Sequence, residues 1–198
     1  MSDKITAKGN TNKDFAPHKA GQFLAQCVDT IDLGEKVEAF QDNPEKLVPK
    51  CVLVFRTGEK NDKGEPHDIG QEYTISMGDR ANLRRILEAW RGQPYTEGQI
   101  SDGVPLDKLT GNWAILTVAH KTSLKGRTYG FIQSVVGAGM IKERPGFEPY
   151  KRAEFWQERK DEYAKDAKAF RNMHNGPAGD VSDSGFPDDT DDGSSMPF

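Results

Sequence analysis

Two kinds of side chain in this sequence could act together on one class of ligand. Aromatic residues occur in segments whose alternating apolar pattern predicts β-strands, and lysines and arginines stand at the ends of those segments or in the loop between the last two. Unpaired bases stack on aromatic rings, while Lys and Arg neutralise the phosphates between them. The pattern therefore predicts an interface for single-stranded nucleic acid. The predicted DNA-binding residues are Lys50, Phe55, Arg56, Tyr73, Trp113, Lys121, Lys125, Arg127 and Tyr129.

The same aromatic and basic residues could instead have structural roles. Trp113 and Tyr129 suit core packing about as well as stacking, because both stand next to loop ends. The large apolar side chains of Phe23, Phe131 and Trp90 are better suited to a core. The arginines between residues 80 and 91 are most simply the solvated face of a helix.

The end of the chain is a second candidate site. Residues 175–198 hold six aspartates and no Lys or Arg, and they finish in an apolar tip that carries the terminal carboxylate. A Phe ring can fill a small pocket while its carboxylate pairs with a cation and the aspartates attract a basic rim. The alternative is a solvating tail whose ending is chance. The predicted partner-binding residues are Asp191, Asp192, Met196, Pro197 and Phe198.

Charge is segregated along the chain. The net charge is -4, and removing the six tail acids leaves residues 1–174 at +2. A slightly basic body fits a phosphate-bearing ligand, and the tail acids could compete with that ligand for the same groove. With 35% hydrophobic residues and a mean hydropathy of -0.75, the 198 residues predict one domain with polar extensions.

Catalytic and membrane signatures are missing from the sequence. It has no Gly-rich phosphate loop, HExxH or GxSxG, and its four histidines are scattered. We therefore expect a non-enzyme without a cofactor or metal. No apolar stretch suits a signal peptide or a bilayer span, which predicts a cytoplasmic protein that does not enter membranes. Cys27 and Cys51 lie in apolar runs and are predicted to be reduced and buried.

The periodicity predicts a mainly β fold. Strands are expected near residues 21–28, 51–55, 72–77, 113–119 and 128–136, with long loops at 33–47, 57–70 and 93–111. Between the third and fourth strands, Leu83, Ile86, Leu87 and Trp90 repeat at helical spacing, with Asp79 or Ser76 as a cap and Gly92 as the end. Five strands with one helix at this position predict an OB-fold barrel, whose loop between strands 4 and 5 frames the ligand groove. An SH3-like barrel or a loose α+β sheet is the alternative.

The predicted organisation has four parts. Residues 1–19 form a flexible arm, 20–141 the OB-fold DNA-binding domain, 142–174 a helical extension with a helix near 150–172, and 175–198 a disordered acidic tail.

Short motifs add a resemblance to known families. The body resembles small OB-fold single-stranded DNA-binding proteins of bacteriophage replication modules through Tyr73-Thr-Ile-Ser76, Asn82-Leu-Arg84, Ala89-Trp-Arg-Gly92, Leu109-Thr-Gly111 and Val118-Ala-His120. The ending is similar to the acidic tip of bacterial single-stranded DNA-binding proteins, although Gly193-Ser-Ser195 separates the last acids from Met-Pro-Phe. This resemblance implies a protein that acts in the cytoplasm of a bacterial host.

The expected function is to bind and protect single-stranded DNA without strong sequence preference during replication or recombination. The tail is expected to recruit replication or recombination proteins, and homo-oligomerisation is compatible with this interpretation. The alternative is an interaction adaptor whose OB-like scaffold does not bind DNA tightly. Binding to labelled oligo-dT at several salt concentrations, with duplex as control, separates the two functions.

Overall fold

The centre of the fold is a five-stranded antiparallel sheet in the order β3-β2-β1-β4-β5. The structure is a computed structural model and describes residues 16–39, 43–124, 126–139 and 141–174. The strands are β1 (Gly21–Glu38), β2 (Lys46–Arg56), β3 (Ile69–Thr74), β4 (Trp113–Thr122) and β5 (Thr128–Gly137). The prediction of a mainly β protein with five strands is confirmed.

β1 is long because it serves two partners. Residues 21–26 pair with β4, and residues 26–38 pair with β2, with register shifts between Cys27 and Asp29 and between Asp32 and Gly34. The expected loop at 33–47 is therefore wrong for most of its length, since β1 runs to Glu38 and β2 starts at Lys46. The charged residues of this hairpin interrupt the alternating apolar pattern from which strands were predicted.

The two edge strands of the sheet approach each other without forming a ladder. The side-chain oxygen of Gln71 on β3 accepts a hydrogen bond from the backbone N–H of Ile132 on β5 at 2.6 Å. Among the described residues, no backbone pairing joins β3 to β5. The sheet is thus curled but not closed among the described residues, so the expected OB-fold barrel is not confirmed.

α1 (Asn82–Arg91) lies between β3 and β4 in sequence, where a helix was predicted. It buries the four predicted apolar residues, and Gly92 ends it in the left-handed conformation at φ 77°. The cap prediction is wrong: Ala81 is the N-cap and provides no side-chain bond, because Asp79 pairs with Arg84 instead. The expected loop that follows also contains two short helical pieces, α2 (Glu97–Ser101) and η1 (Leu106–Leu109).

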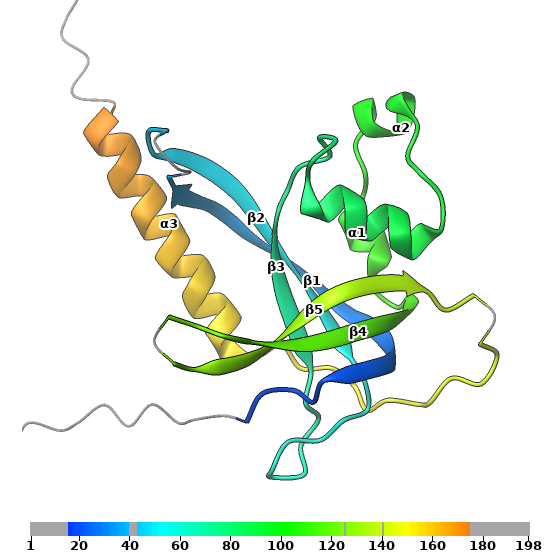
Figure 1. Cartoon of the computed structure of the whole chain (residues 1–198). Helices are drawn as coiled ribbons and strands as arrows, with labels where there is room; N and C mark the ends of the chain where they lie inside the picture. Colours follow the sequence, from blue (N-terminus) through cyan, green and yellow to red (C-terminus); the bar gives the residue numbers. More distant parts are fainter. Residues whose placement is uncertain (1–15, 40–42, 125, 140, 175–198) are drawn as a thin grey trace, which may run out of the picture.

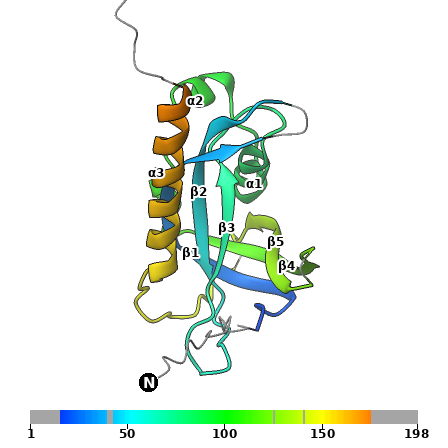
Figure 2. The same cartoon turned by 90° about the vertical axis from the view of Figure 1, so that its left-hand side faces the viewer.

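α3 (Glu154–His174) lies along the β1–β2 hairpin, on the side of the sheet away from α1 (Figures 1 and 2). Trp156 and Tyr163 pack there against a second apolar cluster formed by Ile31, Leu33, Val52 and Val54. Contact is tightest at Gly70, where an added Cβ would lie 2.5 Å from a ring carbon of Trp156. The predicted helix is confirmed, and it belongs to the packed body.

Two smaller expectations concern the cysteines and membranes. Cys27 and Cys51 are buried and unpaired, as predicted. Burial raises the pKa of Cys27 to about 11, so this thiol stays protonated near neutral pH. Across the residues that the structure describes, no helix has the length and apolarity needed to cross a bilayer.

Candidate nucleic-acid interface

Two of the predicted stacking residues lie inside the core. Phe55 is 0% exposed and packs against the Trp90 ring, with centroids 5.4 Å apart. Tyr73 is 4% exposed and belongs to the same cluster. A ring with no accessible face offers nothing for a base to stack on. We therefore correct the prediction and remove both rings from the set of stacking residues.

Two of the predicted phosphate-binding cations are buried and already neutralised. The ammonium of Lys50 lies 2.7 Å from a carboxylate oxygen of Glu38 and donates to the Thr74 hydroxyl at 2.9 Å. Arg56 donates to both carboxylate oxygens of Asp68, at 2.7 and 2.8 Å. Because these charges are satisfied within the fold, Lys50 and Arg56 are also corrected to structural residues.

Trp113 lies apart from the other predicted residues. Its half-buried ring stacks on Phe147, with centroids 5.4 Å apart, and Arg144 lies over it at 5.7 Å. Trp113 begins β4, and Lys121 lies near the end of that strand, about 26 Å away at the usual rise per residue. Trp113 and the β4–β5 turn therefore do not form one continuous stacking surface.

The β4–β5 hairpin does bring predicted residues together. Lys121 faces Tyr129 across the two strands, and Arg127 lies in the connecting turn; all three are exposed. Tyr129 is 44% exposed. The Lys121 ammonium lies 4.2 Å from the centroid of the Phe131 ring, a cation–π contact. Lys125 and the tail residues Asp191, Asp192, Met196, Pro197 and Phe198 lie outside the described residues.

A β-bulge explains why these two aromatic rings face outward. Thr117 pairs with Ser134, but Val118 pairs with Ile132, so Gln133 is an extra residue in β5. An extra residue reverses which side chains face the core on one side of the bulge. Ile132 is accordingly buried, whereas Phe131 is partly accessible. The expectation that Phe131 is simply a core residue is therefore corrected.

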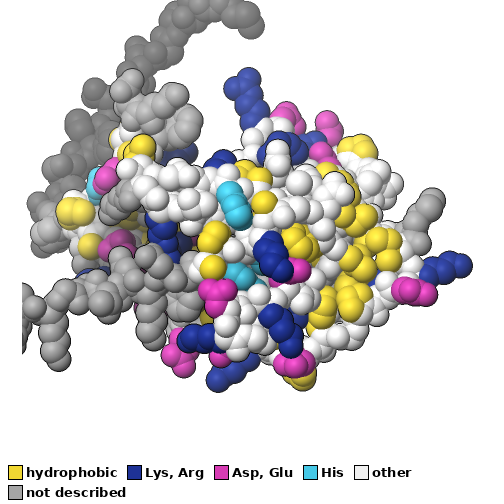
Figure 3. All heavy atoms as spheres, turned by 60° about the horizontal axis from the view of Figure 1, so that its bottom comes forward, with side chains coloured by type: hydrophobic (Ala, Val, Ile, Leu, Met, Phe, Trp, Pro, Cys, Tyr) yellow, Lys and Arg dark blue, Asp and Glu magenta, His cyan; other side chains and the backbone are white. Residues whose placement is uncertain are grey.

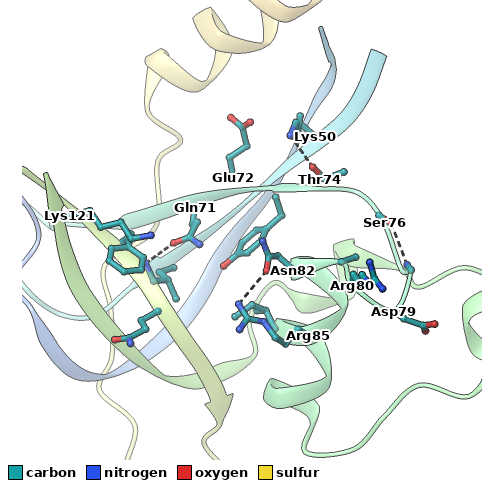
Figure 4. Close-up of a pocket in the computed structure, with 17 residues that line it drawn as sticks. Lys50, Gln71, Glu72, Thr74, Ser76, Asp79, Arg80, Asn82, Arg85 and Lys121 are labelled. Carbon is teal, nitrogen blue, oxygen red and sulfur yellow. Dashed lines mark hydrogen bonds between the residues drawn. The ribbon is translucent and has the colours of Figure 1, made fainter. Parts of the chain in front are cut away.

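A groove of about 1120 Å³ lies between β3, β5 and the start of α1. Figure 4 shows Asn82 and Arg85 at the start of the helix on one side and Lys121 on the other. Arg80 also lines the groove, and so do Phe131 and Gln133. Sequence reasoning missed Arg80, Asn82 and Arg85, because it assigned the arginines to a solvated helix face. The sequence signal that could have placed them in the groove is their position at the start of the predicted helix, directly after the third predicted strand.

The groove carries unbalanced positive charge. For Arg80, Arg85 and Lys121, no carboxylate lies within salt-bridge distance among the described residues. Both acids in the lining are engaged: Asp79 pairs with Arg84 at 2.7 Å, and Glu72 accepts from the Tyr163 hydroxyl at 2.8 Å. In Figure 4 Glu72 points to the side of β3 opposite Arg85. The net local field attracts an anion.

The face that carries the loop after β2 has a different character. Figure 3 shows Lys and Arg side chains mixed there with Asp, Glu and His side chains, and an apolar patch toward one side. Mixed charges give no continuous path for a phosphate backbone. The groove is therefore the better candidate for a polyanionic ligand.

Within the described part of the chain, no group of three or more His, Cys, Asp or Glu could hold a metal ion. No family model matches the chain, and no curated protein matches it. Functional assignment therefore depends on the charge and shape of this surface.

Proposed function

We propose that the protein binds single-stranded DNA in the groove between β3, β5 and α1 and along the adjoining β4–β5 hairpin. The observation that carries the proposal is a set of three cations, Arg80, Arg85 and Lys121, that have no salt-bridge partner among the described residues. They lie beside the accessible rings of Tyr129 and Phe131. Cations that track phosphates and aromatics that stack on bases are the two parts of a single-strand site.

The chemistry favours single strands over duplex. In a duplex the base faces are stacked on one another, so Tyr129 and Phe131 could reach only the backbone. A single strand can turn its bases toward β5 and its phosphates toward α1. This mode reads no base edges, and it is therefore tolerant of sequence.

The topology supports an OB-type assignment. A strand order of β3-β2-β1-β4-β5 with a helix between β3 and β4 fits a partly open OB barrel, whose loop between strands 4 and 5 frames the ligand. This order agrees with the resemblance to phage single-stranded DNA-binding proteins. We extend the proposal to protection of single strands in replication or recombination, with recruitment of partner proteins by the tail tip.

Fluorescence anisotropy with labelled oligo-dT and a matched duplex tests the proposal. We expect preferential binding to oligo-dT, with log Kd rising by about 0.7 per unit of log salt for each phosphate neutralised. Lys121→Glu should weaken binding and reduce that slope. Lys168→Glu on α3 is the matched control, because it makes the same charge change at an exposed residue across the sheet. Equal affinity for duplex, or no binding, would favour the adaptor function instead.

A further inference from the structure

The first turn of α1 is an uncapped helix start inside the groove. Ala81 makes no side-chain cap, and the turn contains no acidic residue. The backbone N–H groups of Asn82, Leu83 and Arg84 have no acceptor among the described residues. These orphan donors and the helix dipole both favour an anion.

A buried hydroxyl without a hydrogen-bond partner among the described residues is a second, independent feature of the same groove. Tyr73 lines the groove, and its hydroxyl is buried without a hydrogen-bond partner among the described residues. Burial raises the pKa of this phenol far above its ordinary value, so the group stays protonated and can donate. Buried polar groups in native proteins are nearly always paired, and an exception calls for an explanation.

Arg85 connects the two features. Its guanidinium donates to the Asn82 side-chain oxygen at 3.3 Å, which holds it beside the first turn (Figure 4). Its charge also acts on the Tyr73 hydroxyl, in the direction opposite to burial. Arg80 flanks the same turn, while the Asp79 carboxylate points away from Arg85 and pairs with Arg84. The local groups are therefore mostly donors and cations.

We propose that the first turn of α1, together with Arg80, Arg85 and the Tyr73 hydroxyl, is a phosphate site that fixes one phosphodiester of the bound strand. Tetrahedral phosphate oxygens can accept from several convergent donors at once, which suits a set rich in N–H and O–H groups. A phosphate within a chain is favoured over a free ion, because the groove continues to Lys121 and Phe131. This inference rests on the proposed function.

Tyr73→Phe is the decisive variant, because it removes a single oxygen atom. The hydroxyl makes no hydrogen bond to the described residues, so its loss should leave the melting temperature unchanged or raised. A phosphate contact predicts about tenfold weaker oligo-dT binding from the loss of a hydrogen bond to a charged group. The matched control is Tyr95→Phe, a half-buried tyrosine outside the groove, which should change neither quantity. Undiminished oligo-dT affinity in Tyr73→Phe would overturn the site.

A backbone scan adds a position-specific readout. In the shortest oligo-dT that binds fully, each phosphate is replaced in turn by a neutral methylphosphonate. A fixed site predicts one position with a much larger loss than the others, and that excess should shrink in Arg85→Ala. An even loss at all positions would contradict the phosphate site while leaving single-strand binding intact.

A third arm separates this inference from the proposed function. If the intact protein does not prefer oligo-dT, the proposed function fails, and inorganic phosphate becomes the probe. A rise in melting temperature with phosphate that is lost in Tyr73→Phe would still support the site. The absence of any rise would overturn it.

Discussion

Tyr129→Ala should weaken DNA binding without unfolding the protein. Its ring is 44% exposed, and Lys121 is the residue opposite it on the facing strand. A cross-strand pair of this kind contributes about 0.2–1 kcal/mol to stability. A ring that stacks on one base contributes about 1–3 kcal/mol to binding. The expected rise in Kd for oligo-dT is therefore roughly 5- to 150-fold.

Phe55→Ala is the contrasting variant, because the sequence alone placed both rings in the same interface. Phe55 is fully buried against Trp90, so truncation should cost about 3–5 kcal/mol of unfolding free energy. For a chain of this size that corresponds to a melting temperature lower by roughly 6–20 °C. Well below that temperature, oligo-dT affinity should be nearly unchanged.

Two measurements on each variant decide between these roles. Anisotropy with labelled oligo-dT gives Kd, and circular dichroism on heating gives the melting temperature. An unchanged Kd in Tyr129→Ala would refute its role as a stacking platform. A large loss of melting temperature in that variant would instead place the ring in the core. A reduced affinity in a fully stable Phe55→Ala protein would contradict the placement of Phe55.

Three further predictions test other parts of the molecule. Gly70→Ala should lower stability by about 1–3 kcal/mol in thermal unfolding, because the new Cβ meets Trp156, while oligo-dT affinity stays constant. Burial lowers the pKa of His18 in the folded protein. Below about pH 6.5 the unfolded chain therefore binds more protons than the folded protein. The free energy of unfolding should decrease as the pH is lowered from there toward the folded pKa. This fall should be smaller in His18→Gln but not in His174→Gln, an exposed control on α3. Phe198→Ala should keep oligo-dT affinity yet lose capture of replication proteins in a pull-down, and identical partners for both baits would contradict a tail-tip function.

Local periodicity predicted the five strands and the two longer helices, but not the full length of β1 or the short helices α2 and η1. The apolar residues of α1 follow a helical repeat, and Gly92 ends the helix, so neighbouring residues carry the whole signal. The end of the β1–β2 hairpin next to its turn was predicted as a loop, because Lys36 and Glu38 look like loop residues. In the structure they pair with each other at 2.9 Å, and Lys50 joins them from β2. Such pairing depends on strand register, which the sequence does not display.

The site was only partly predictable for a related reason. The sequence shows that a residue is basic, but it does not show whether an acidic side chain neutralises that residue in the folded protein. Arg56 is neutralised by Asp68, whereas the hydrogen-bond partner of Arg85 among the described residues is the neutral Asn82. The outward turn of Phe131 depends on one extra residue in β5, and alternation alone places that ring in the core. Distant partners and a single bulge therefore separate structural residues from candidate binding residues.

The open seam explains why a groove exists at this place. A backbone ladder between β3 and β5 would hold the strands about 4.8 Å apart and leave no space between them. Here the side-chain oxygen of Gln71 accepts the hydrogen bond from the Ile132 N–H. The distance between the two strands is therefore set by a glutamine side chain and not by a backbone ladder. Among the described residues, the facing edges of β3 and β5 form no backbone ladder, and such edges invite pairing with other chains. Charged side chains beside an edge disfavour such pairing, and Arg85 and Lys121 lie beside this seam. On the proposed function, the same two charges would also attract the phosphates of the bound strand.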